Sequence, residues 1–203
     1  MKRIISTLLF LTLSSISSLV FAQKFSGGVI GGVTASQVAG DNYSGYLKPG
    51  INVGTWLGLE LTERSSLQME LSYIMKGSLF SVTKSDQLSY KLNLNYLQVP
   101  VLFQYRILDK IQVEGGLAAS FLISHYEEYD KQELESENFK AISLSFLFGV
   151  SYQITDRVKL ALMTNNDLTP IRKVGVRGSG TTRFGGDHGQ FNDLLVFNLY
   201  YRL

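Results

Sequence analysis

The stretch ISLSFLFGVSYQI at residues 142–154 decides the fold. Its even-numbered residues are all large and apolar, whereas its odd-numbered residues are mostly serine, glycine or glutamine. This period of two is typical of a β-strand with one apolar face, because a helix would scatter the same residues around its axis. We therefore expect an extended strand here, with its two faces in different surroundings.

The same alternation recurs along the chain and predicts eight strands. They are expected at 25–34, 51–61, 67–79, 90–106, 111–124, 142–154, 158–167 and 195–203. In 90–106 the apolar residues change parity after Tyr96, and Pro100, which cannot donate to a ladder, follows shortly. One extra residue near Leu97, a β-bulge, would restore a common face. The alternative is two short strands with a break between them.

The connections alternate in length. Three are tight polar turns, at 62–65, 108–110 and 155–157, and four are long, at 35–47, 80–89, 125–140 and 168–191. Outer-membrane barrels combine short turns at one end with long loops at the other. The pattern predicts an all-β chain, an eight-stranded antiparallel up-and-down transmembrane β-barrel. A soluble, lipocalin-like barrel with its faces reversed is the alternative.

The polar face favours the membrane barrel. It is rich in glycine and serine, which suit the crowded inside of a narrow barrel, and it carries three acids and three bases: Glu60, Glu70, Glu114, Arg106, Lys159 and Arg202. Buried charges need partners, and this balance permits pairing. We interpret the six residues as a structural salt-bridge network that plugs the interior, because an eight-stranded barrel barely holds its own side chains. A proton or ion path, in a narrow transporter, is the alternative.

The N-terminus has the features of a secretory signal peptide. A basic start, Lys2-Arg3, precedes an apolar run that ends at Ala22, and cleavage is expected there. The domain organisation is then a signal peptide at 1–22 and a barrel at 23–203. Lys2 and Arg3 account for the net charge of +2, so the mature chain balances 17 basic against 17 acidic residues. This organisation predicts export to the outer membrane of a Gram-negative bacterium, with outer-membrane lipid as a partner.

The composition argues against most catalytic and cofactor chemistry. The chain has no cysteine and two histidines, so we expect no metal, no cofactor and no catalytic residues. The weak net charge gives no reason to expect nucleic acid. Ser124-His125 suggests a lipid-modifying or hydrolytic barrel enzyme as an alternative, although strand neighbours point to opposite faces and no G-x-S-x-G elbow is present.

Two long loops carry opposite charge and are candidates for interaction. Segment 126–140 has a net charge of −4, with the acids Glu127, Glu128, Asp130, Glu133, Glu135 and Glu137. Segment 171–190 has a net charge of +3, with the bases Arg172, Lys173, Arg177 and Arg183. We expect the loops to attract each other, or one of them to bind an extracellular or envelope protein. Two solvated, mobile loops are the alternative.

Several short motifs resemble a known family. Glu70-Leu71-Ser72-Tyr73 with Lys76-Gly77, Tyr96-Leu97-Gln98-Val99-Pro100 and the segment 148–152 are similar to the PorT-type outer-membrane β-barrel proteins of the Bacteroidetes group. Gln98 stands where that family usually has an acidic residue. The resemblance implies an outer-membrane barrel and transfers no catalytic residues. We therefore predict a non-enzymatic envelope structural protein or loop-mediated interaction platform, with a secretion-system accessory as a weaker alternative.

Overall fold

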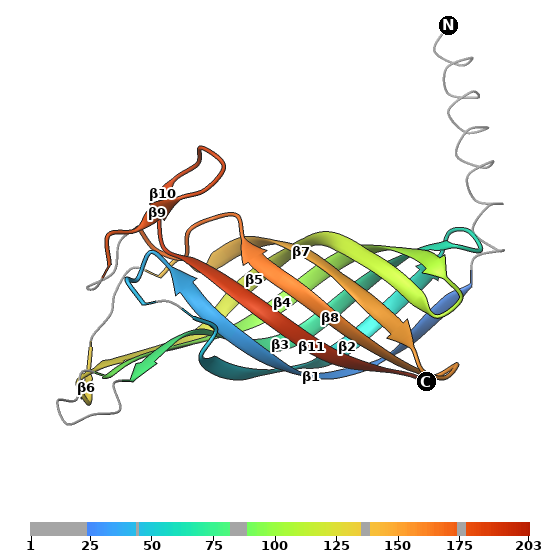
Figure 1. The fold of residues 1–203 in the computed structure, drawn as a ribbon, viewed down its shortest axis with the longest axis horizontal. Coiled ribbons are helices and arrows are strands. Elements are labelled where there is room, and N and C mark those ends of the chain that lie inside the picture. Colours follow the sequence, from blue (N-terminus) through green and yellow to red (C-terminus); the bar gives the residue numbers. More distant parts are fainter. Residues whose placement is uncertain (1–23, 44, 82–88, 135–138, 174–177) are drawn as a thin grey trace, which may run out of the picture.

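The computed structural model describes residues 24–43, 45–81, 89–134, 139–173 and 178–203. Within these ranges, eight long strands form a closed antiparallel barrel (Figure 1). They are β1 (Phe25–Ala39), β2 (Lys48–Glu60), β3 (Ser65–Ser81), β4 (Ser89–Leu108), β5 (Ile111–Tyr129), β7 (Ile142–Gln153), β8 (Val158–Asp167) and β11 (Phe191–Arg202). Each strand pairs with the next, and β11 pairs with β1 to close the ring. The expected eight-stranded up-and-down barrel is confirmed.

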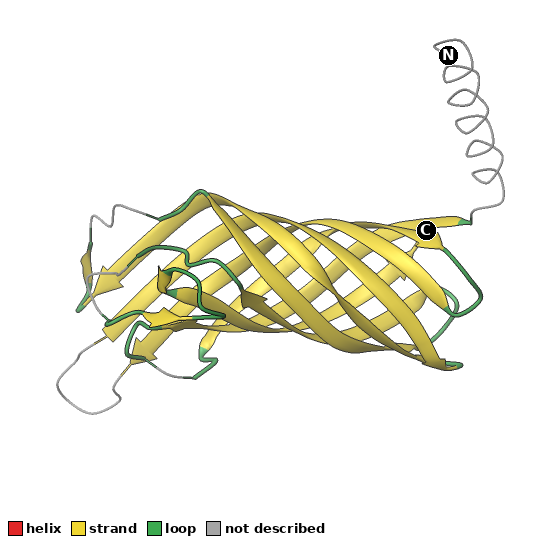
Figure 2. Cartoon of the chain, turned by 90° about the horizontal axis from the view of Figure 1, so that it is seen from above, coloured by secondary structure: helices red, strands yellow, loops and turns green. Residues whose placement is uncertain are grey.

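The two ends of the barrel differ as expected. The turns after β2, β4 and β7 are short and lie at the same end as the C-terminus (Figures 1 and 2). The long connections gather at the other end, where the short strands β6 (Gln132–Glu133), β9 (Thr181–Thr182) and β10 (His188–Gly189) lie. No helix in the described ranges is long and apolar enough to cross a membrane. The expected signal peptide, residues 1–22, lies outside those ranges.

The apolar residues face outward. Along β7, Phe146, Phe148 and Val150 are about half exposed, whereas Ser145 and Ser151 are buried inside the barrel. The same alternation holds along the membrane-length part of the other strands. The inward face uses glycine where neighbouring strands come close: a Cβ at Gly116 would lie 2.0 Å from the carbonyl oxygen of Val101. The outside of this barrel is therefore apolar, as lipid requires.

A bulge lies close to the position expected near Leu97, but the prediction that β4 carries its extra residue was wrong. Strand β4 keeps one register with β3 from Tyr105 to Ser89, and its even-numbered residues face inward throughout. The register shift lies in the neighbouring strand, where Asn95 pairs with Ser124 and Tyr96 with Leu122, so Ile123 is the extra residue. The apolar residues of β4 change face because the interior itself becomes apolar toward the loop end.

The interior is filled in alternating layers. Toward the loop end lies an apolar cluster of buried residues: Val38, Ile74, Tyr90, Leu92, Leu94, Tyr96, Ile171, Leu194 and Val196. A second apolar cluster lies nearer the short turns: Ile30, Leu102, Ala118, Leu147, Ala161, Met163 and Tyr200. Buried polar side chains lie between and beside them. The expectation of an interior plugged by salt bridges was therefore incomplete, because two apolar clusters supply much of the filling.

Candidate functional site

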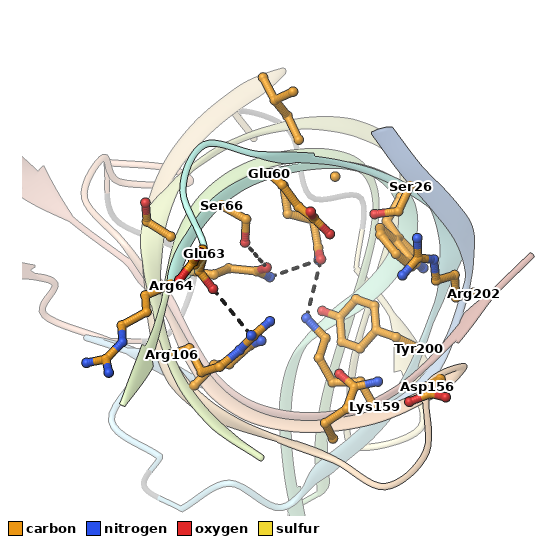
Figure 3. Close-up of a pocket in the computed structure, with 18 of the residues that line it drawn as sticks. Ser26, Glu60, Glu63, Arg64, Ser66, Arg106, Asp156, Lys159, Tyr200 and Arg202 are labelled. Atoms are coloured by element: carbon orange, nitrogen blue, oxygen red, sulfur yellow. Dashed lines mark hydrogen bonds between the residues drawn. The ribbon is translucent and has the colours of Figure 1, made fainter. Parts of the chain in front are cut away.

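A cavity of about 750 Å³ opens at the short-turn end of the barrel (Figure 3). Glu60, Arg106 and Arg202, at the ends of β2, β4 and β11, stand around its mouth and are exposed. Lys159 and Tyr200 line it from deeper in the barrel and are buried. Three of the six inner-face charges identified in the sequence thus lie at an open mouth rather than in a sealed network.

The other three inner-face charges lie in one hydrogen-bonded chain below this mouth. Lys159 Nζ is 3.0 Å from Glu114 Oε1 and 3.3 Å from Gln68 Oε1. Gln68 Nε2 donates to Glu70 Oε1 at 2.6 Å, and the Tyr200 hydroxyl donates to the same oxygen at 2.9 Å. Sequence reasoning missed Gln68 and Tyr200, although both have the parity of the inner face. These hydrogen bonds link four strands and support a structural role for the three charges.

We expect Glu114→Ala to lower the free energy of unfolding by about 1.5–3 kcal/mol, the usual range for hydrogen bonds to charged groups. The substitution leaves Lys159 without its carboxylate, but this side chain borders the open cavity and water can reach it. Chemical denaturation of the barrel in vesicles measures the change. Conductance in planar bilayers should stay at background in both proteins, and a large conductance in either would contradict the structural interpretation.

A buried ion pair in the middle of the barrel was not anticipated. Lys76 Nζ lies 3.4 Å from Asp167 Oδ1, and both side chains have no exposed surface. Asp167 also accepts hydrogen bonds from Ser145 Oγ at 2.8 Å and Asn192 Nδ2 at 2.9 Å. Lys76 has inner-face parity, and Asp167 is the last residue of β8. The pair connects β3 with β8 across the interior.

A third ion pair closes the loop end. Arg172 forms a two-pronged interaction with Glu127, Nη1 to Oε2 at 2.7 Å and Nη2 to Oε1 at 2.8 Å. The Tyr90 hydroxyl donates to Glu127 Oε1 at 2.6 Å, and Arg172 Nε donates to Gln190 Oε1 at 2.6 Å. Arg172 and Glu127 are 2% and 1% exposed, and the preceding Ile171 belongs to the apolar cluster. The fourth connection therefore folds into the barrel mouth.

The other described loop charges are divided between paired and exposed residues. Arg183 binds the carboxylate of Asp193 through both terminal nitrogens, and Lys140 lies 3.6 Å from Asp187. Asp130, Glu133 and Lys173 are exposed. Glu128 is half-buried and accepts a hydrogen bond from the Tyr126 hydroxyl at 2.8 Å. Glu135, Glu137 and Arg177 lie outside the described residues. The structure thus brings Glu127 and Arg172 together but does not pair the two segments charge for charge.

The first long connection also contacts the segment around Arg172 and Gln190 that closes the loop end. Gln190 Nε2 and the Gly180 N–H both donate to the Gly40 carbonyl, at 3.2 and 3.1 Å. Asp41 is fully buried beside it and accepts a hydrogen bond from the Tyr43 N–H at 2.9 Å. Burial raises the pKa of the Asp41 carboxyl above its ordinary value, because the charged form loses its hydration. Three connections therefore meet over the mouth in a defined arrangement.

The residues behind the enzyme alternative, Ser124 and His125, are neighbours in β5. The Ser124 hydroxyl accepts a hydrogen bond from Asn95 Nδ2 at 2.9 Å, and the His125 ring lies 5.0 Å from the Phe139 ring. The part of the chain that the structure describes contains no group of three His, Asp or Glu side chains arranged to hold a metal ion. The cavity at the short-turn end is lined by neither histidine.

Comparisons with known proteins agree with the fold. A family model described as "Outer membrane protein beta-barrel domain" matches residues 21–170. The solved structure of Ail from Yersinia pestis is similar at a TM-score of 0.53 and 12% identity, covering 89% of this chain and 99% of Ail. Neisserial surface protein A is similar at 0.54 and 14%, covering 90% and 99%. A search of curated proteins gave no match. At these identities the solved structures establish the fold alone.

Proposed function

Because the chain belongs to the outer membrane protein beta-barrel domain family, we propose that it is a non-enzymatic barrel whose loop end is a platform for binding a protein partner. Cleavage of residues 1–22 would release the barrel for insertion. The short turns would face the periplasm and the long connections the outside, as in other outer-membrane barrels. Membership of the narrower PorT-type group remains a prediction from the motifs, and so does a purely structural role in the envelope.

The observation that carries this proposal is the buried interaction of Arg172 with Glu127. The desolvated, two-pronged ion pair fixes the described part of the fourth connection around Arg172, and a preformed surface loses less entropy when a partner binds. Solvated loops without such contacts would have to order first. The geometry therefore supports recognition through the shape of the loop end.

The nature of the partner follows from the charges that are left exposed. A second Ail structure is a complex with the heparin analogue sucrose octasulfate, at a TM-score of 0.52 and 11% identity to this chain. Here Arg172 and Arg183 are occupied by carboxylates, and the exposed surface carries both signs, with Asp130, Glu133 and Lys173. Mixed charge favours a protein partner over a sulfated glycan.

Site-specific photo-crosslinking in intact cells tests the proposal. A photoreactive residue at Glu133 or Lys173, both exposed at the loop end, is expected to give a cross-linked product of discrete mass. The same residue at Lys110, exposed in the short turn after β4, is the matched control and should not give that product. Heat-dependent gel migration shows that each variant is folded. Absence of a loop-end product, or the same product from Lys110, would contradict the platform.

A further inference from the structure

We propose that the cavity at the short-turn end binds a small solute or chain end carrying oxyanion groups, either carboxylate or phosphate. This cavity lies at the opposite end of the barrel from the loops, so the inference does not rest on the proposed platform. It opens on the side of the short turns and holds about 750 Å³. That volume is within the range of small-ligand sites.

Two arginines give the cavity its chemistry. Arg106 and Arg202 belong to β4 and β11, which stand opposite each other in the ring of eight strands. Figure 3 shows both side chains reaching into the opening from opposite walls. The ion pairs found among the described residues involve other cations, and Arg106 donates only to the carbonyl oxygen of Glu63, at 3.3 Å. Both guanidinium groups therefore have donors available to a ligand.

The rest of the wall is polar and partly prearranged. Lys159, Gln68 and Gln104 are buried and hydrogen-bonded at the inner end of the cavity, where Gln104 Nε2 donates to Gln68 Oε1 at 2.9 Å. Glu114 neutralises Lys159. The other charged residues that line the cavity balance, four arginines against four acids: Arg64, Arg106, Arg157, Arg202, Glu60, Glu63, Asp109 and Asp156. Selection of an oxyanion therefore rests on the free guanidinium donors of Arg106 and Arg202 and not on the net charge of the wall.

The geometry of the guanidinium group narrows the ligand class. A guanidinium fork matches the two oxygens of a carboxylate or a phosphate. Because the forks come from opposite walls, a probe with two oxyanion groups tests whether one ligand engages both. Succinate, a dicarboxylate, and inorganic phosphate are therefore informative probes. Succinamide, the neutral diamide of succinate, keeps the shape and removes the charge.

The chain provides its own reporter of binding. Trp56 is the single tryptophan of the sequence, lines this cavity and contacts the Tyr200 ring at 6.4 Å between ring centres. In the full mature barrel in detergent, succinate or phosphate should change Trp56 fluorescence saturably, and succinamide should not. The probe that saturates identifies the oxyanion. Replacing both arginines, with Arg106→Gln and Arg202→Gln, should weaken binding by roughly tenfold or more per arginine.

Lys110→Gln is the matched control. It removes one positive charge from the same end, but Lys110 is exposed in the turn after β4 and is not among the residues that line the cavity. Its affinity for the probe should equal that of the unchanged protein, and heat-dependent gel migration confirms folding of every variant. Four results would overturn the proposal: no saturable change at millimolar probe, equal binding of succinamide, full affinity in the double variant, or an equal loss in Lys110→Gln.

Discussion

Replacing Asp167 by alanine is expected to lower the free energy of unfolding of the barrel by about 3–5 kcal/mol, the cost of leaving a buried charge without its partner. Lys76 would remain fully buried with its ammonium group beside the gap. Ser145 and Asn192 would lose the acceptor that they share. Lys159 lines the open cavity at the short-turn end, whereas Lys76 and Asp167 do not, so the expected effect exceeds that of Glu114→Ala.

Denaturant titration of the folded barrel in lipid vesicles measures this loss. Asp156→Ala is the matched control, because Asp156 is an exposed aspartate in the short turn after β7, and its replacement should change the free energy by no more than about 0.5 kcal/mol. Asp167→Asn keeps one acceptor oxygen and should fall between the two. Equal stability of Asp167→Ala and Asp156→Ala would show that the buried pair contributes nothing.

The membrane-length part of the fold could be predicted from the sequence because one physical rule governs it. Where lipid lies outside and a narrow polar lumen inside, apolar and small polar residues must alternate. Residues 142–154 follow this rule without exception on their outward face, and the structure places Phe146 and Phe148 outside as expected. The short and long connections then left little choice of topology.

The rule fails where the strands leave the apolar band. In β4, Leu92 and Leu94 are as apolar as Val101, yet they face inward because the interior near the loops is a packed core. Alternation alone cannot reveal at which residue the apolar face changes sides. The extra residue Ile123 in β5 adds to this, because it reverses parity and turns Glu127 inward.

The loop-end site was only partly predictable for the same reason. Glu127 and Arg172 were identified as charged loop residues, but their burial depends on β5 continuing past its bulge and on Ile171 entering the core. Both depend on contacts between residues that are far apart in the sequence, and no local sequence pattern predicts such contacts. At the other end, Arg106 and Arg202 have inner-face parity, but parity cannot tell a sealed ion pair from an open mouth.

Replacing Glu127 by glutamine is expected to speed trypsin cleavage after Arg172 and Lys173 by about tenfold to hundredfold. The change removes a carboxylate that accepts hydrogen bonds from two nitrogens of Arg172. Hydrogen bonds to charged groups contribute about 1.5–3 kcal/mol to stability. Cleavage follows the population of the opened segment when opening is fast. The cleavage rate should therefore rise by the factor by which that population rises. Cleavage of the barrel in vesicles, followed by mass spectrometry, gives the rate at each site.

Salt and a second variant distinguish a buried pair from the attraction of two charged loops. If the net charges of −4 and +3 held the segments together, Glu133→Gln would loosen them as much as Glu127→Gln, and molar salt would do the same to the unchanged protein. A pair that is 2% and 1% exposed is shielded from such screening. We therefore expect Glu133→Gln and molar salt to leave the cleavage rate nearly unchanged. Acceleration by either one would mean that diffuse charge, and not the contact of Arg172 with Glu127, closes the loop end.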